Sequence, residues 1–204
     1  MASELNGLFN SLTWNDYPER NGPAPGAGQI VVAAFTDAKH TVSPRSALIP
    51  GTRKVRLVEA TVRIFLEKVT SFKMSWMPTT LPQKDQDDLL DHEQGHYDIH
   101  ALLTRDLFLD IMKLKSKEYP GSAAVTADIL ALQRATTDKS KDVQKKYDTE
   151  TDSGRKPTEQ AKWKRFISTA FNTPASPAEF AADARATPIK VRLLSVLAQN
   201  GFVF

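Results

Sequence analysis

Three of the four histidines in this chain of 204 residues fall within residues 92–100, which read HEQGHYDIH. The first five of these residues match H-E-x-x-H. On a helix, two histidines four residues apart lie one turn apart on the same face, so both can bind one ion. The pattern predicts that His92 and His96 bind Zn²⁺ and that Glu93 is the catalytic base for a metal-activated water. It therefore predicts a zinc metallopeptidase that hydrolyses peptide bonds. The alternative is a pair of core histidines with satisfied hydrogen bonds.

A catalytic zinc site needs a third protein ligand, and the end of the second predicted helix offers two acids. Glu150 continues the inward-facing stripe of that helix and is slightly preferred, whereas Asp148 would turn inward if the helix ended at Tyr147. Tyr147 itself is a candidate hydrogen-bond donor to the oxyanion, or else a core aromatic. His100 lies about 12 Å along the helix axis from His92, so we expect it to be structural or to support a ligand, and metal ligation by His100 is the less favoured alternative.

Two further roles follow from position in the sequence. Asp91, Asp98 and Asp110 are near the histidine pair, and a metal-bound histidine often donates its second N–H to a carboxylate. The strand that ends at Trp76 is a candidate to line the cleft and pair with an extended peptide or protein substrate.

The spacing of apolar residues changes along the chain from the alternation typical of strands to the three- and four-residue steps typical of helices. Residues 43–51 are broken by Pro44 and Pro50, and a change of phase near Ala60 predicts a slip in the strand register. The strand patterns cover residues 29–35, 53–70 and 71–77. The helical patterns cover residues from about 80 to 119, 122 to 152 and 158 to 171.

Strands followed by helices indicate an α+β fold, with an N-terminal antiparallel sheet packed on the long H-E-x-x-H helix in a zincin-like arrangement. We predict one metallopeptidase-like domain over residues 1–204. Its C-terminal tail is apolar enough to dock back as a strand or a helix, after a Pro/Ala-rich connector with room for a short helical turn. The expected parts are an arm and loop (1–28), a sheet (29–79), a helical part with the metal site (80–171) and a C-terminal extension (172–204).

Composition excludes several classes of site and partner. The chain has no cysteine, which excludes disulfides, thiolate zinc sites and cysteine nucleophiles. Its net charge is +3 with dispersed basic residues, so we expect no nucleic-acid partner. No window has the apolar length of a membrane span. The N-terminus does not match a Sec-type signal peptide, which leaves a cytoplasmic protein or another route of export. Composition does not indicate an oligomeric state.

Several motifs together resemble a known family, the bacterial DUF922 proteins described as Zn-dependent proteases. The resemblance implies a zinc metallopeptidase and brings in Asp148 and Glu150 as matches to its last motif. Ser153 departs from it, because a histidine is expected there, and this departure favours a metal-stabilised binding module without catalysis. A delivered effector or toxin with protease activity is a further alternative. The matching motifs are LTWNDY (12–17), SW (75–76), LDHEQGHYDI (90–99) and YDTETDSG (147–154), within residues 12–165.

Overall fold

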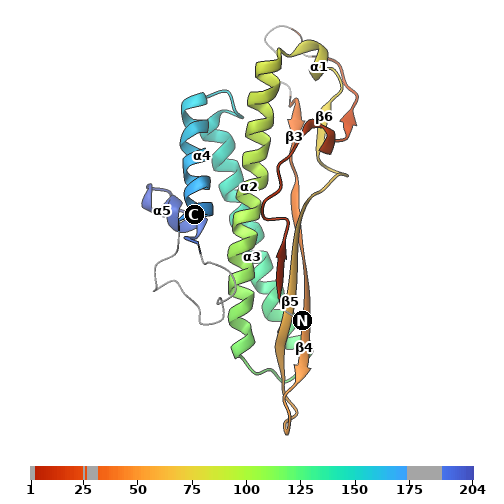
Figure 1. The fold of residues 1–204 in the computed structure, drawn as a ribbon, viewed down its shortest axis with the longest axis vertical. Coiled ribbons are helices and arrows are strands. Elements are labelled where there is room, and N and C mark those ends of the chain that lie inside the picture. Colours follow the sequence, from red (N-terminus) through yellow and green to blue (C-terminus); the bar gives the residue numbers. More distant parts are fainter. Residues whose placement is uncertain (1–2, 25, 27–31, 174–189) are drawn as a thin grey trace.

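The structure, a computed structural model, describes residues 3–24, 26, 32–173 and 190–204. It confirms an α+β fold in which the strands precede the main helices (Figure 1). The strands are β1 (Glu4–Asn6), β2 (Glu19–Arg20), β3 (Ala34–Phe35), β4 (Ala38–Leu48), β5 (Val55–Leu66) and β6 (Phe72–Met74). The helices are α1 (Met77–Thr80), α2 (Gln83–Lys113), α3 (Ser122–Thr151), α4 (Pro157–Asn172) and α5 (Leu193–Gln199), with 3₁₀ turns at Trp14–Asp16 and Leu114–Ser116.

The strands form two sheets, which we call the hairpin sheet (β1-β5-β4) and the small sheet (β2-β6-β3). The sheet was expected to be antiparallel, and β4 pairs with β5 and β3 with β6 in this way, although no strand was expected where β4 lies. Nor were β1 and β2 expected, which pair in parallel with β5 and β6. These two strands also show that the N-terminal segment, predicted as an arm and loop, contributes to both sheets.

The long β4–β5 hairpin contains the predicted slip in register. Arg45 pairs with Glu59 but Ser46 pairs with Leu57, so Val58 is an extra residue on β5. Such a bulge shifts the side-chain alternation by one residue, which keeps buried side chains on one face on both sides of it. The predicted break at Pro44 is wrong, because β4 is an edge strand and tolerates a residue without an N–H.

The other predicted strands are shorter than expected. Within the described part of residues 29–35, only Ala34 and Phe35 form a strand, and residues 27–31 lie outside the described ranges. Strand β6 ends at Met74, so Trp76 lies beyond it and immediately precedes α1.

Helix α2 runs between the other long helices on one side and the strands on the other (Figure 1). Ile99 and Leu102 pack against α3, α4 and the C-terminal tail, in a cluster that contains Trp163. Leu107 and Ile111 instead pack in a second cluster, with residues of the hairpin sheet and of α3. Because both sides are packed, α2 holds its side chains in fixed positions relative to α3 and to the strands.

The C-terminal tail docks as a helix, which settles the strand-or-helix alternative. Arg105 of α2 donates hydrogen bonds to the carbonyls of Ala170 (2.8 Å) and Val191 (2.9 Å), and Asp106 accepts one from the backbone N–H of Leu193 (3.2 Å). The Pro/Ala-rich connector lies largely outside the described residues. Within the ranges that the structure describes, no helix has both the length and the apolarity to cross a membrane.

Candidate metal centre

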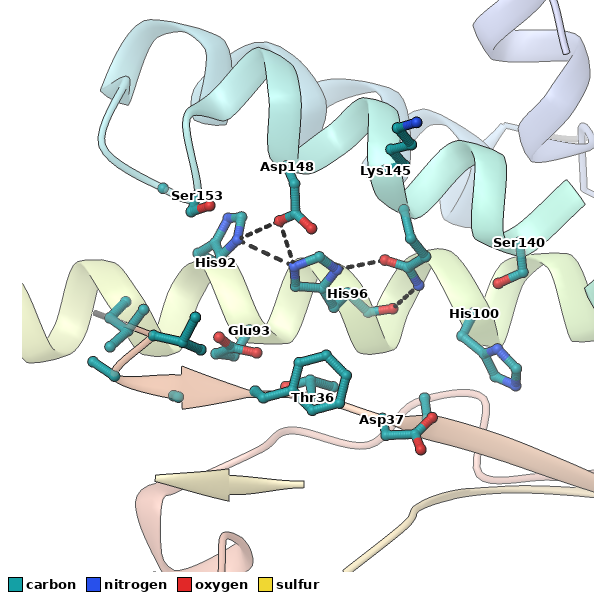
Figure 2. A pocket seen from close by; sticks show the side chains of 18 of the residues that line it. Thr36, Asp37, His92, Glu93, His96, His100, Ser140, Lys145, Asp148 and Ser153 are labelled. Carbon is teal, nitrogen blue, oxygen red and sulfur yellow. Dashed lines mark hydrogen bonds and ion pairs between the residues drawn. The ribbon is translucent and has the colours of Figure 1, made fainter. Parts of the chain in front are cut away.

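Helices α2 and α3 bring His92, His96 and Asp148 together (Figure 2). The Nε2 atoms of the two histidines are 3.1 Å apart, and Asp148 Oδ1 lies 3.1 Å from His92 Nε2 and 2.9 Å from His96 Nε2. One potential ligand atom from each residue lies within 4.8 Å of the others. Two imidazoles and one carboxylate are a donor set that zinc prefers, and three protein ligands leave a fourth position open.

The third residue of this group is Asp148, and the structure does not bring the slightly preferred Glu150 into it. Helix α3 continues to Thr151, so its buried stripe steps by four residues from Tyr147 to Thr151 and passes position 150. Glu150 accepts a hydrogen bond from Trp163 Nε1 (3.0 Å) and pairs with Lys162.

Two glutamines set the orientation of the histidines, and sequence reasoning missed both. Gln160 Oε1 lies 3.2 Å from His92 Nδ1, and Gln144 Oε1 lies 2.5 Å from His96 Nδ1. Amide oxygens only accept, so each histidine donates from Nδ1, and Nε2 is the ring atom left to face Asp148 or a metal. Gln144 precedes Asp148 by one helical turn, a spacing that could have identified it, whereas Gln160 comes from α4 and has no such signal.

The three acids that were expected to support the histidines are occupied elsewhere. Asp91 pairs with Lys164 (2.6 Å). Asp98 accepts a hydrogen bond from Gln94 (2.7 Å). Arg192 donates to Asp110 from its guanidinium (2.7 Å).

Tyr147 packs against His92 and does not line the cavity as an oxyanion donor would. It is fully buried, its ring stacks on the His92 ring with centroids 4.7 Å apart, and its hydroxyl donates to the His92 carbonyl (3.1 Å). The same hydroxyl accepts a hydrogen bond from Gln160 (2.6 Å). Burial raises the pKa of Tyr147 above its ordinary value, so the hydroxyl keeps its proton. The catalytic role expected for Tyr147 is therefore corrected to a positioning role.

Two glycines permit this close packing. A Cβ at Gly95 would lie 2.2 Å from the Tyr147 hydroxyl oxygen, so no larger residue fits between the two histidines of the motif without a shift. Gly154 has φ +85°, and a Cβ there would lie 3.0 Å from His92 Cβ.

Glu93 is 4% exposed, and its Oε2 atom has no hydrogen-bond partner among the described residues. It lines the same cavity as the histidine pair, and Figure 2 shows it toward strand β3 while the histidines point toward α3. Leaving a buried carboxylate oxygen without a partner is costly, so such an atom indicates a ligand or water that this residue is meant to contact.

The cavity has a volume of about 1270 Å³ and lies between α2, α3 and the β3–β4 segment. All four histidines of the chain line it, as do Glu93, Asp148 and Ser153. Ser153 lies beside His92 in a left-handed conformation (φ 52°), outside the group of three donors (Figure 2).

Strand β3 lines the cavity, and the strand that ends before Trp76 does not. Strand β6 lies between β2 and β3, so it has no free edge for a substrate, and Trp76 is buried in a cluster with Met74 and Met77. Strand β3 is at the edge of the small sheet. The expected role of the Trp76 strand in pairing with substrate is therefore wrong.

Without a metal, Asp148 and His96 stabilise the charged forms of one another. Burial favours the protonated form of Asp148, but hydrogen bonds from His92 and His96 outweigh it and hold the Asp148 pKa well below its usual range. Burial also lowers the pKa of His96, but the hydrogen bond to Asp148 and the charge of Glu93 raise it overall. Asp148 is therefore ionised at neutral pH, the form in which it could ligate a metal.

His100 belongs to a different pair. Its Nε2 atom lies 3.2 Å from Nδ1 of His40, which comes from β4. His100 therefore lies outside the group of His92, His96 and Asp148. This agrees with the expectation from its distance along the helix.

Comparisons with known proteins show no relationship for this chain: no protein-family model, no curated protein and no solved structure matches it significantly.

Proposed function

We propose that this protein is a zinc-dependent metallopeptidase in which His92, His96 and Asp148 hold the metal and Glu93 is the general base. One observation carries the proposal: three metal-ligating atoms converge within 4.8 Å in a cavity that also receives the unpartnered carboxylate of Glu93. A structural zinc site is normally closed by four protein ligands, whereas three ligands beside a cavity are typical of catalysis.

The chemistry divides between the metal and the chain. Zinc, when bound, polarises a carbonyl and lowers the pKa of water toward ~7. Glu93 accepts the proton of the attacking water and passes it to the leaving amine. His92 and His96 are held by Gln160 and Gln144 in the tautomer that presents Nε2, and Tyr147 fixes the ring plane of His92.

The walls of the cavity favour an extended peptide as substrate. Strand β3 runs along the side toward which Glu93 points, and an edge strand can pair with an extended segment through backbone hydrogen bonds. Val32, Phe35, Leu81 and Leu89 give this wall and the N-terminal part of α2 apolar side chains for the substrate to contact. A zincin-like arrangement of strand, metal and helix is part of the proposal, and the resemblance to DUF922 proteins supports it.

The test is the variant Glu93→Gln, assayed on a complex peptide mixture with mass-spectrometric detection of new termini. We expect zinc content to stay at the wild-type level and hydrolysis to fall by at least about 100-fold, because general-base catalysis contributes about 10²–10⁴-fold. Glu118→Gln, which changes an exposed glutamate paired with Lys54, is the matched control and should keep full activity.

Full activity of Glu93→Gln would exclude this mechanism. Stoichiometric zinc in a wild-type protein that cleaves none of the peptides would instead favour the metal-stabilised binding module. No zinc in wild-type protein prepared with excess metal would remove the proposed site altogether.

A further inference from the structure

The four histidines of the chain form two pairs in one cavity, and the metallopeptidase proposal uses only one pair. His40 and His100 form the other, with ring nitrogens 3.2 Å apart, against 3.1 Å for His92 and His96. His100 lies one turn of α2 beyond His96, and His40 reaches the cavity from strand β4. The second pair therefore joins two different elements across the far part of the cavity.

We propose that His40 and His100 form a second binding site for an imidazole-preferring transition-metal ion, such as Zn²⁺, Co²⁺, Ni²⁺ or Cu²⁺. Two nitrogens that share one tetrahedral ion at ~2.0–2.1 Å are about 3.3 Å apart, close to the separation of His40 Nδ1 and His100 Nε2. Both residues are on regular elements, since β4 is paired along β5 and α2 is packed on two sides. Little rearrangement is therefore needed to place an ion between them.

The protonation states of the pair suit a metal. Burial lowers the pKa of His100 to about 3, helped by the neighbouring His40, and burial also lowers the pKa of His40. Both imidazoles are thus neutral at physiological pH, which is the form that binds metals. Of the charged groups nearby, Asp37 raises the pKa of His100 and Lys39 lowers it.

The surroundings make this site weaker than the first. No acidic side chain joins His40 and His100 in a three-ligand group among the described residues. The buried hydroxyl of Thr104 lies 3.4 Å from His40 Nδ1. Water would complete the coordination of the ion, so this site should fill after the site of His92, His96 and Asp148. Ni²⁺ and Cu²⁺ should bind to the His40–His100 site more tightly than Co²⁺.

The experiment is a titration of the metal-free, untagged full chain with Ni²⁺, followed by calorimetry. We expect two ions per chain in the wild-type protein, the second weaker. His40→Gln and His100→Gln should each lose the second ion, or weaken it at least tenfold, and keep the first. Ser140→Ala changes a residue that lines the cavity without carrying an imidazole, and it should keep both ions.

The double variant His92→Gln/His96→Gln separates this inference from the proposed function, because it should lose the first ion and keep the second. If His40→Gln binds the same number of ions as the wild type, with the same affinities, the pair is a hydrogen-bonded structural contact and the inference is overturned. His40 is only partly buried, on an edge strand, so this variant serves if His100→Gln fails to fold.

Discussion

The two histidine pairs have nearly the same distance between their facing nitrogens, 3.1 Å and 3.2 Å, but they differ in what surrounds them. His92 and His96 face a carboxylate, and an amide oxygen orients each ring. His40 and His100 have nearly the same separation between nitrogens, with one hydroxyl nearby. His96 and His100 are also four residues apart on α2, so spacing alone would allow them to share an ion. The choice between candidate pairs is made by the side chains that α3 and α4 place opposite α2.

The largest expected effect comes from removing the carboxylate that distinguishes the first pair. Four-ligand zinc sites bind with about 10–16 kcal/mol, so one ligand accounts for about 3 kcal/mol, or ~100-fold in affinity. We therefore expect Asp148→Asn to weaken zinc binding at the first site by about that factor, measured by competition with a chromogenic chelator. Asp152→Asn, which changes a half-exposed acid at the C-cap of α3, is the control and should change little. Equal affinities for Asp148→Asn and wild type would remove Asp148 from the site.

A smaller effect, on folding stability, is expected from disturbing the packing of Tyr147 against α2 near the first pair. In Gly95→Ala, the new Cβ would meet the Tyr147 hydroxyl at 2.2 Å, and overpacking of this kind costs about 1–3 kcal/mol. Urea unfolding of the metal-free protein should show that loss. Gly121→Ala is the matched control, because nothing lies within 4 Å of its Cβ position. A stability loss as small as that of the control would show that Tyr147 is not held against α2.

Within the first pH unit below about 6.5, the smallest effect is a loss of stability that belongs to the second pair. The pKa of His100 is about 3 in the folded protein and about 6.5 when unfolded, so the unfolded chain binds more protons between these values. Stability is therefore complete above pH ~6.5 and falls as the pH falls toward 3, by at most about 1.4 kcal/mol per pH unit for this group. In metal-free His100→Gln this component should be absent. Parallel stability profiles for the variant and the wild type would contradict the burial of a neutral His100.

Local patterns in the sequence were enough to predict the three long helices α2, α3 and α4, but neither α1 nor the helical form of the tail. The predicted start of α3 agrees with the structure, and the ends of α4 differ by one residue, because helical periodicity and the glycine and proline signals at helix ends act over a few residues. The slip in β5 was predicted within a few residues for the same reason. Strand β4 was missed because Pro44 was interpreted as a break, although an edge strand tolerates it. Strands β1 and β2 were missed because each is only two or three residues long and is defined by pairing with a distant strand.

The sequence by itself determined that His92 and His96 share a helix face with Glu93 beside them, because a helix places residues four apart on one side whatever surrounds it. Only the tertiary structure decided that Asp148 completes the group while Glu150 binds Trp163. It also decided that Gln144 and Gln160 orient the rings, and that His40 meets His100. These contacts depend on how α3, α4 and β4 pack against α2, and packing between distant segments leaves no fixed spacing in the chain.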